Sequence, residues 1–346
     1  MKTDFLSLTL PELELEITRL GYPKFRAKQI FEWMYKGADF PEMSNLPQKM
    51  RSELSEKACV RIPIVAKKLV SSLDGTAKYL FELSDGHYIE SVLMHYKYGF
   101  TICISSQVGC RMGCRFCAST IDGKVRDLLP SELLGQIIAA SKDSGERISH
   151  VVMMGIGEPL DNYDNVIKFL KLVNMQDGLG ISYRNISVST CGIVPKIAAL
   201  AEEELPITLS ISLHAVDDDT RSEIMPVNNA YGVAELLCAC NSYFEKTGRR
   251  ISFEYTLING KNDSRDEAEK LARVLKKYMK CPVHVNLIPL NPVAEREYKT
   301  VDRQNAILFA STLNRHGINA TVRRTLGPDI NASCGQLRRQ NSQKRE

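Results

Sequence analysis

Three closely spaced cysteines are the residues of this sequence whose types and spacing point most directly to chemistry. They are Cys110, Cys114 and Cys117, in the spacing C-x3-C-x2-C. A structural zinc site requires four ligands, and no obvious C-x2-C or H-x3-H partner follows the triplet. Three thiolates suit a [4Fe–4S] cluster in which one iron has no protein ligand and stays open to bind a small molecule. Zinc binding and a chance spacing remain as alternatives.

The elements that must position these cysteines form an alternating series. From about residue 101, short β-branched runs alternate with amphipathic helical stretches, and the triplet directly follows the first run. The strand-like runs are 101–106, 150–155, 185–190, 207–213, 251–258, 283–290 and 319–323. The helical stretches between them are 130–144, 163–175, 194–204, 233–247, 264–279 and 301–316. Six βα units in succession predict a parallel sheet with right-handed crossovers. Periodicity alone leaves both a doubly wound sheet and a barrel open.

A cysteine triplet with this spacing at the head of a βα series resembles the radical S-adenosylmethionine (SAM) superfamily. The aromatic residue just before the last cysteine, Phe116, matches as well. The resemblance implies an α/β fold with a partial (β/α)6 barrel. It also implies one [4Fe–4S] cluster held by Cys110, Cys114 and Cys117. The open iron would bind the amino and carboxylate groups of SAM, and electron transfer would cleave SAM to a 5′-deoxyadenosyl radical.

Polar residues follow several of the predicted strands, where α/β folds place their ligands. After the second strand comes a Gly-Glu-Pro motif that matches the superfamily and would hold the amino group of SAM. Taken singly, such residues read as turn or cap residues. Taken together, at successive strand ends, they predict a lining for the carboxylate, ribose and adenine of SAM. The candidate residues are Gly157, Glu158, Ser189, Ser212, Leu213, His214 and Asn291.

Two further cysteines narrow the resemblance. Cys103 lies shortly before the triplet, and Cys334 lies near the C-terminus in the stretch Ile-Asn-Ala-Ser-Cys-Gly-Gln. Their surroundings, together with Arg-Arg-Thr-Leu-Gly at 323–327, are similar to the RlmN/Cfr family of radical SAM RNA methyltransferases. This similarity covers nearly the whole chain.

The resemblance assigns a role to each of these thiols. The C2 carbon of adenine is electron-poor and does not displace a methyl group from a sulfonium, so radical chemistry is needed. Cys334 would take a methyl group from a first SAM. A radical from a second SAM would take a hydrogen from that S-methyl group, and the methylene radical would add to the base. Cys103 would then form a transient disulfide with Cys334 and release the methylated base. Glu90 matches the proton acceptor of the family, although by sequence alone it is an exposed strand carboxylate.

The two branches of the family differ in the carbon that they methylate. One makes 2-methyladenosine in 23S rRNA and in tRNA, and the other methylates C8 of the same rRNA adenosine. Ser119 and Thr120, directly after the triplet, resemble the C2 branch. The side chains give no physical reason for C2 over C8. A different radical SAM chemistry and a non-catalytic metal-containing RNA-binding protein also stay open.

The chain divides into four predicted parts. These are an N-terminal helical domain at 1–65, a β-linker at 66–95, the radical SAM core at 96–326 and a basic C-terminal tail at 327–346. The first part reads as three short helices, at 10–20, 24–35 and 46–59. Between residues 22 and 36 basic and aromatic side chains interleave. That pattern is compatible both with RNA binding and with the core of a small domain.

Composition limits the class of protein and its surroundings. The 346 residues are 44% hydrophobic and 25% charged, which is ordinary for a globular protein. Of the net charge of +4, the surplus lies in residues 315–346, a modest indication of a polyanionic partner. No apolar run approaches the ~18 residues of a membrane helix. The acidic N-terminus is unlike a secretory signal, so we expect a cytoplasmic protein with reduced cysteines. The expected partners are 23S rRNA, tRNA and a reducing system such as flavodoxin, with no membrane, and we expect a monomer.

Overall fold

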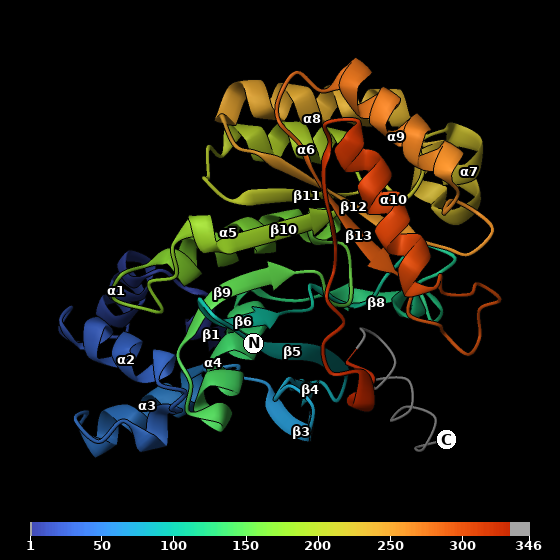
Figure 1. Cartoon of the computed structure of the whole chain (residues 1–346). Helices are drawn as coiled ribbons and strands as arrows, with labels where there is room; N and C mark the ends of the chain where they lie inside the picture. The colour runs from blue at the N-terminus through green and yellow to red at the C-terminus, as the bar shows by residue number, and fades with distance from the viewer. Residues whose placement is uncertain (1, 333–346) are drawn as a thin grey trace.

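One ten-stranded sheet forms the centre of the protein in the computed structural model, which describes residues 2–332 (Figure 1). The strand order is β14-β13-β12-β11-β10-β9-β6-β5-β4-β3, so the sheet is open, with β14 and β3 as its edge strands. Within this sheet, the seven neighbouring strands from β14 across to β6 all pair in parallel. Its strands are β6 (Gly99–Cys103), β9 (Ile148–Met153), β10 (Ile186–Thr190), β11 (Thr208–Ser212), β12 (Ile251–Leu257), β13 (His284–Pro289) and β14 (Asn319–Val322). The predicted parallel sheet and partial barrel are confirmed.

Helices connect consecutive parallel strands and cover the outer face of the sheet. They are α4 (Pro130–Ser144), α5 (Tyr163–Asn174), α6 (Val194–Glu202), α8 (Val233–Thr247), α9 (Arg265–Tyr278) and α10 (Arg303–Arg315). Neighbouring helices pack side by side, α4 with α5, α6 with α8 and α9 with α10 (Figure 1). A short extra helix, α7 (Asp218–Ile224), precedes α8 and was not expected from the sequence.

Local signals explain where several of these helices begin and end. The Ser264 side chain accepts a hydrogen bond from the backbone N–H of Glu267 and so caps α9. Helix α4 ends at Gly145 and α8 ends at Gly248, both in the left-handed conformation that terminates helices. These positions can be read directly from the sequence, which is why the expected bounds of α4 and α8 agree with the structure.

The segment predicted as a β-linker extends the same sheet. It contains β3 (Ile64–Val70), β4 (Ala77–Glu82) and β5 (Tyr88–Tyr96), which pair antiparallel with one another. Strand β5 then pairs antiparallel with β6 through a tight turn. The segment is therefore continuous with the barrel sheet, and one side of β5 faces the barrel interior.

The N-terminal helices pack on the outside of the barrel. They are α1 (Leu10–Arg19), α2 (Arg26–Tyr35) and α3 (Gln48–Lys57), and β1 (Thr3–Asp4) pairs with β2 (Ala58–Cys59) beside them. Phe5 and Leu6 are fully buried in the short helical turn that contacts α4 and α5. The hydroxyl of Ser131 on α4 donates to the carboxylate of Asp4. Figure 1 shows these helices beside α4 and α5.

Among residues 2–332, no helix has both the length and the apolar character needed to cross a membrane.

Candidate active site

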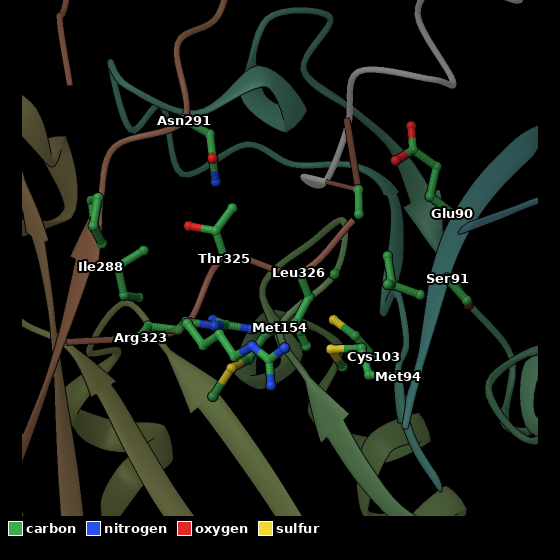
Figure 2. A pocket seen from close by; sticks show the side chains of 15 residues that line it. Glu90, Ser91, Met94, Cys103, Met154, Ile288, Asn291, Arg323, Thr325 and Leu326 are labelled. Atoms are coloured by element: carbon green, nitrogen blue, oxygen red, sulfur yellow. The ribbon is translucent and has the colours of Figure 1, made fainter. Parts of the chain in front are cut away.

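Two adjoining pockets lie at the C-terminal ends of the parallel strands. The triplet pocket, about 240 Å³ in volume, is lined by Cys110, Cys114, Cys117 and residues from several strand ends. The Glu90 pocket, about 220 Å³, is lined by Glu90 and Cys103 together with residues after β14 (Figure 2). The two pockets have a shared wall, made of Met154, Gly155, Ile288 and Arg323. A small molecule in one pocket is therefore next to groups in the other.

The cysteine triplet lies on a loop whose two ends are held together. Strands β7 (Gln107–Gly109) and β8 (Lys124–Asp127) pair antiparallel at its base. The backbone N–H of Cys110 donates to the carbonyl of Gly123 at 2.9 Å. Inside the loop, the Thr120 hydroxyl bonds the carbonyls of Cys114 at 2.9 Å and Cys117 at 3.1 Å. The strand pair and these hydrogen bonds thus hold the loop that carries the three cysteines, and this loop faces the triplet pocket.

The three cysteines fit an iron–sulfur cluster by donor chemistry and by placement. Cys110 and Cys114 are buried, and all three residues line one pocket. Burial, reinforced by the neighbouring thiol of Cys117, raises the pKa of Cys110 to about 12. Within residues 2–332, no three His, Cys, Asp or Glu side chains are gathered closely enough to hold a single metal ion. Soft thiolates are the ligands of iron–sulfur clusters, so these residues are suited to hold one.

Glu158 connects the loop after β9 to the end of β10. Its carboxylate accepts hydrogen bonds from the backbone N–H groups of Leu160 and Cys191, at 2.9 and 2.8 Å. Burial raises the pKa of Glu158, and these hydrogen bonds oppose the increase. Its own backbone N–H donates to the Gln107 side chain at 2.9 Å. Glu158 lines the triplet pocket, and its hydrogen bonds join the loop after β9 to the end of β10 in the wall of that pocket.

Gly157 is required where it stands in the triplet pocket. Its φ of +107° lies in the region that favours glycine. A Cβ at this position would lie 2.7 Å from the Gln107 Cβ and backbone nitrogen and 2.7 Å from the Ser106 hydroxyl oxygen. The backbone of the Gly-Glu-Pro loop therefore packs closely against the residues after β6.

The residues predicted at the ends of the third and fourth strands divide between pocket and core. Ser189, Ser212 and His214 line the triplet pocket. Leu213 does not: its side chain is fully buried in the hydrophobic core, because alternate residues of a strand face opposite sides. The prediction that Leu213 contributes to the cofactor lining is thus not met by its side chain.

His214 is a neutral side chain in the wall of the triplet pocket. Burial and the nearby Arg221 lower its pKa to about 3. Its Nδ1 accepts the backbone N–H of Thr256 at 2.9 Å, and its ring lies edge-on to Phe116 with centroids 5.1 Å apart. These contacts orient the imidazole, leaving it suited to hydrogen bonding rather than to holding charge.

Cys103 is a protonated thiol at neutral pH in the Glu90 pocket. Burial raises its pKa to about 11, while the positive charge of Arg323 acts in the opposite direction. Asn291 lines this pocket and not the triplet pocket, which differs from its predicted place beside SAM. Figure 2 shows Cys103 and Met94 on the side of the pocket nearest β5 and Asn291 on the side of β13.

Glu90 is buried, whereas the sequence indicated an exposed strand carboxylate. It is 2% exposed, and its Oε2 lies 3.1 Å from the ammonium nitrogen of Lys78 on β4. Lys78 is itself 0% exposed. Lys78 was not among the predicted site residues, although a lysine directly before the apolar run Tyr-Leu-Phe is a usable signal, because lysine is rarely buried without a partner.

The chain approaches the Glu90 pocket again near its C-terminus. Residues Arg323, Arg324, Thr325, Leu326 and Ala332 all line it. Ala332 is the last residue that the structure describes. Cys334, the predicted methyl carrier, lies outside the described residues.

Glu254 is a second buried carboxylate that sequence analysis did not single out. It lies on β12, is 6% exposed and lines the triplet pocket. Burial raises its pKa, while Arg323 and a hydrogen bond with Asn286 act in the opposite direction. A charged residue within the apolar run of β12 was the available signal. Together with Arg323, it makes the boundary between the two pockets polar.

The interleaved basic and aromatic stretch of the N-terminal helices divides into two sets of side chains. Phe31 is buried, and Tyr35 packs on it with ring centroids 4.5 Å apart. Phe25 is 59% exposed, with the Arg26 guanidinium 4.9 Å from its ring centroid. Lys36 lies over the Trp33 ring in the same way. The stretch therefore provides core residues on one side of α2 and a basic, aromatic surface on the other.

A parallel α/β barrel with a cysteine-triplet loop at its mouth defines a radical SAM enzyme. The Radical SAM superfamily model matches residues 104–275, and the model for a ribosomal RNA large subunit methyltransferase N-terminal domain matches residues 3–60. A crystal structure of a radical SAM methyltransferase from Sphaerobacter thermophilus superposes with a TM-score of 0.92 and 40% identity, covering 96% of this chain and 98% of that one.

Full-length relatives narrow the class to a family. A protein of Clostridium novyi (strain NT) named "Probable dual-specificity RNA methyltransferase RlmN" is 52% identical, over 97% of this chain and 98% of its own length. A protein of the same name from Lachnospira eligens is 54% identical over 97% of this chain and 96% of its own. The chain belongs to the RlmN family of radical SAM methyltransferases.

Proposed function

We propose that this protein methylates C2 of adenosine in RNA, with 23S rRNA and tRNA as substrates, through S-methylation of Cys334 and a transient disulfide with Cys103. The observation that carries the proposal is the wall shared by the two pockets. It puts a site suited to SAM cleavage beside a site that contains a thiol and a buried carboxylate. The relatives' names, "Probable dual-specificity RNA methyltransferase RlmN", and the match of residues 3–60 to a ribosomal RNA large subunit methyltransferase domain support RNA as the substrate.

Each group in the Glu90 pocket has a task in this reaction. Cys334 is two residues beyond Ala332 in the pocket wall, and two residues span at most ~7 Å. Cys103 lines the same pocket as Ala332, and the proposed disulfide would require the Cα atoms of Cys103 and Cys334 to come within about 7 Å of each other. Glu90 is the group placed to take the proton from the attacked carbon.

The triplet pocket has the complementary task. Cys110, Cys114 and Cys117 would hold the [4Fe–4S] cluster, and SAM cleaved there would supply the radical. The loop of Gly157 and Glu158 would bind the SAM amino group. We assign two SAM molecules to each turnover, one for the methyl group and one for the radical. A one-electron donor such as flavodoxin, a cytoplasmic location and a monomeric state complete the proposal.

The decisive experiment is mass spectrometry of nucleosides from 23S rRNA and tRNA of a deletion strain complemented with variants of this chain. The wild type should restore 2-methyladenosine, and Cys334→Ala should restore none, because the carrier thiol is absent. Cys238→Ala, which removes an exposed cysteine on α8, is the matched control and should behave as wild type. Appearance of 8-methyladenosine instead would assign the chain to C8 methylation. Methylation by Cys334→Ala would disprove the carrier mechanism.

A further inference from the structure

The turn between β3 and β4 holds the segment that leads to the carrier cysteine. The Asp74 carboxylate accepts the backbone N–H of Gly327 at 2.9 Å. The Asp329 carboxylate accepts the Ser71 hydroxyl at 2.6 Å and the backbone N–H of Ser72 at 2.9 Å. Although desolvation acts in the opposite direction, the hydrogen bonds lower the pKa of Asp74 to about 2, so it is ionised at neutral pH. The hydrogen bonds from Ser71 and Ser72 likewise lower the pKa of Asp329. Both carboxylates are thus charged acceptors, which makes these hydrogen bonds strong.

Lys78 makes the next contact along the same segment. Its ammonium donates to the backbone carbonyl of Asn331 at 2.9 Å and lies 3.1 Å from the Glu90 carboxylate. The Lys78 side chain has no solvent-exposed surface, and that of Glu90 has almost none. A buried ammonium is costly unless it is paired, so its position depends on both of these oxygens. One side chain therefore joins the end of the described chain to the predicted base.

We propose that Lys78 is a positioning residue that couples the placement of residues 327–332, which lead to Cys334, to Glu90, keeping this carboxylate directed toward the pocket when that segment is in place. This proposal rests on the proposed function, because it takes Glu90 as the proton acceptor and Cys334 as the carrier. Lys78 does not itself touch the substrate; it acts through Glu90 and through the backbone of Asn331.

Other charged groups near Glu90 do not replace Lys78 in this arrangement. The titratable and charged side chains that line the Glu90 pocket are Cys103 from β6 and Arg323 and Arg324 after β14. Arg323 also acts on Cys103 and Glu254. Lys78 differs from these groups because its ammonium contacts both the Glu90 carboxylate and a carbonyl of the tail segment.

The first test is the pH dependence of RNA methylation by Lys78→Met. Removing a positive charge that lies 3.1 Å from a carboxylate should move the acid limb of the pH–rate profile up by about one pH unit. On the acid limb itself the rate should fall about tenfold, the equivalent of that shift, while the rate on the plateau should change much less. Lys78→Arg keeps the charge and should return the profile toward wild type. Lys67→Met, which removes an exposed lysine on β3, is the matched control and should leave the profile unchanged.

The second test is hydrogen exchange, which requires no activity. In Lys78→Met the amides of residues 327–332 should exchange faster than in wild type, because the segment has lost the contact at Asn331. If Lys78→Met fails to fold, the double variant Lys78→Met with Glu90→Gln, which leaves no unpaired buried charge, is used for the same measurement. A purely structural role for Lys78 would lower the rate equally at every pH.

An unshifted pH profile together with unchanged exchange of residues 327–332 would overturn the proposal. Failure of the proposed function is a distinct result, because wild type would then produce no methylated adenosine at any pH. In that case the exchange measurement by itself decides whether Lys78 holds the tail segment.

Discussion

Cys103 illustrates how the surroundings of one side chain set its reactivity. A thiol attacks another sulfur only as the thiolate, and burial raises the pKa of Cys103 to about 11. At neutral pH the thiol is therefore protonated, and only a small fraction is ready to attack. The neighbouring Arg323 favours the thiolate and opposes the effect of burial. In the proposed reaction, release of the product through a disulfide should accordingly be limited by deprotonation of Cys103.

We therefore expect the covalent enzyme–RNA adduct to decay faster as pH rises. Below the pKa the thiolate fraction grows about tenfold for each pH unit, so the decay rate should follow that slope from pH 7 toward pH 9. The measurement is single-turnover decay of the adduct on denaturing gels. Cys103→Ala should accumulate the adduct at every pH. A decay rate that does not change with pH would show that another group, and not this thiol, limits release.

The loop between β7 and β8 shows how a short element holds reactive residues in place. Gly109 and Gly123 both have positive φ, at +78° and +68°. A Cβ on Gly109 would lie 1.9 Å from the carbonyl oxygen of Gly123, whereas a Cβ on Gly123 would meet nothing within 4 Å. A side chain would be strained by the backbone conformation at either position. Only at Gly109 would it also prevent the two ends of the loop from meeting.

Gly109→Ala should lose most of its iron and acid-labile sulfide, because the two ends of the triplet loop must move apart. Gly123→Ala is the matched control: it carries only the cost of a left-handed residue, about 1–2 kcal/mol, and should keep most of its cluster. Iron and sulfide per chain, measured after anaerobic purification, compare the two variants. Equal iron content in both would show that closure of the loop base does not support the metal site.

Lys78 and Glu90 lie on adjacent strands that the sequence indicated only as a linker. Because β3, β4 and β5 extend the barrel sheet, residues of this segment line the Glu90 pocket and hold the tail. A strand pattern alone does not reveal this, because it does not show that β5 continues into the barrel sheet by pairing with β6. The carboxylate of Glu90 could be chosen only by family resemblance, and the one local signal for Lys78 was a lysine beside an apolar run.

Charge is distributed unevenly over the whole molecule. The chain has a net charge of +4, and residues 315–346 contain seven Lys and Arg against two Asp and Glu. Arg323 and Arg324 of this stretch line the Glu90 pocket. At the two ends of α2, Arg26 and Lys36 lie against aromatic rings. An RNA substrate would bring phosphates toward these positive charges.

RNA affinity should fall steeply with salt, and the slope should decrease when basic residues of the tail are neutralised. Arg338→Gln with Arg339→Gln, at positions outside the described residues, should lower the slope of log affinity against log salt by about 1.5 if both contact phosphates. Fluorescence anisotropy with tRNA over a series of KCl concentrations measures the affinity and therefore this slope. Lys276→Gln with Lys277→Gln, exposed on α9, is the matched control and should keep the wild-type slope. An unchanged slope in the tail variant would show that Arg338 and Arg339 do not contact phosphates.

The parts of this protein that could be read from the sequence are those with local causes. Apolar periodicity predicted the parallel strands and their connecting helices, because burial of a repeating face is encoded by neighbouring residues. Proline at the start and glycine after the end marked α4. The cysteine spacing indicated that the three thiols would lie together, as they do in the lining of the triplet pocket, because they are on one short loop. Short elements such as α7 and the β7–β8 pair were missed, since contacts with distant residues stabilise them.

The arrangement of the two pockets depended on contacts between residues far apart in the chain. Met154, Ile288 and Arg323 come from three different strand ends, yet together they separate the triplet pocket from the Glu90 pocket. Leu213 turned into the core and Asn291 into the Glu90 pocket because strand register and sheet twist set the direction of a side chain, and neither is visible in a linear motif. Residue types thus specified the chemistry available, and folding specified which groups meet.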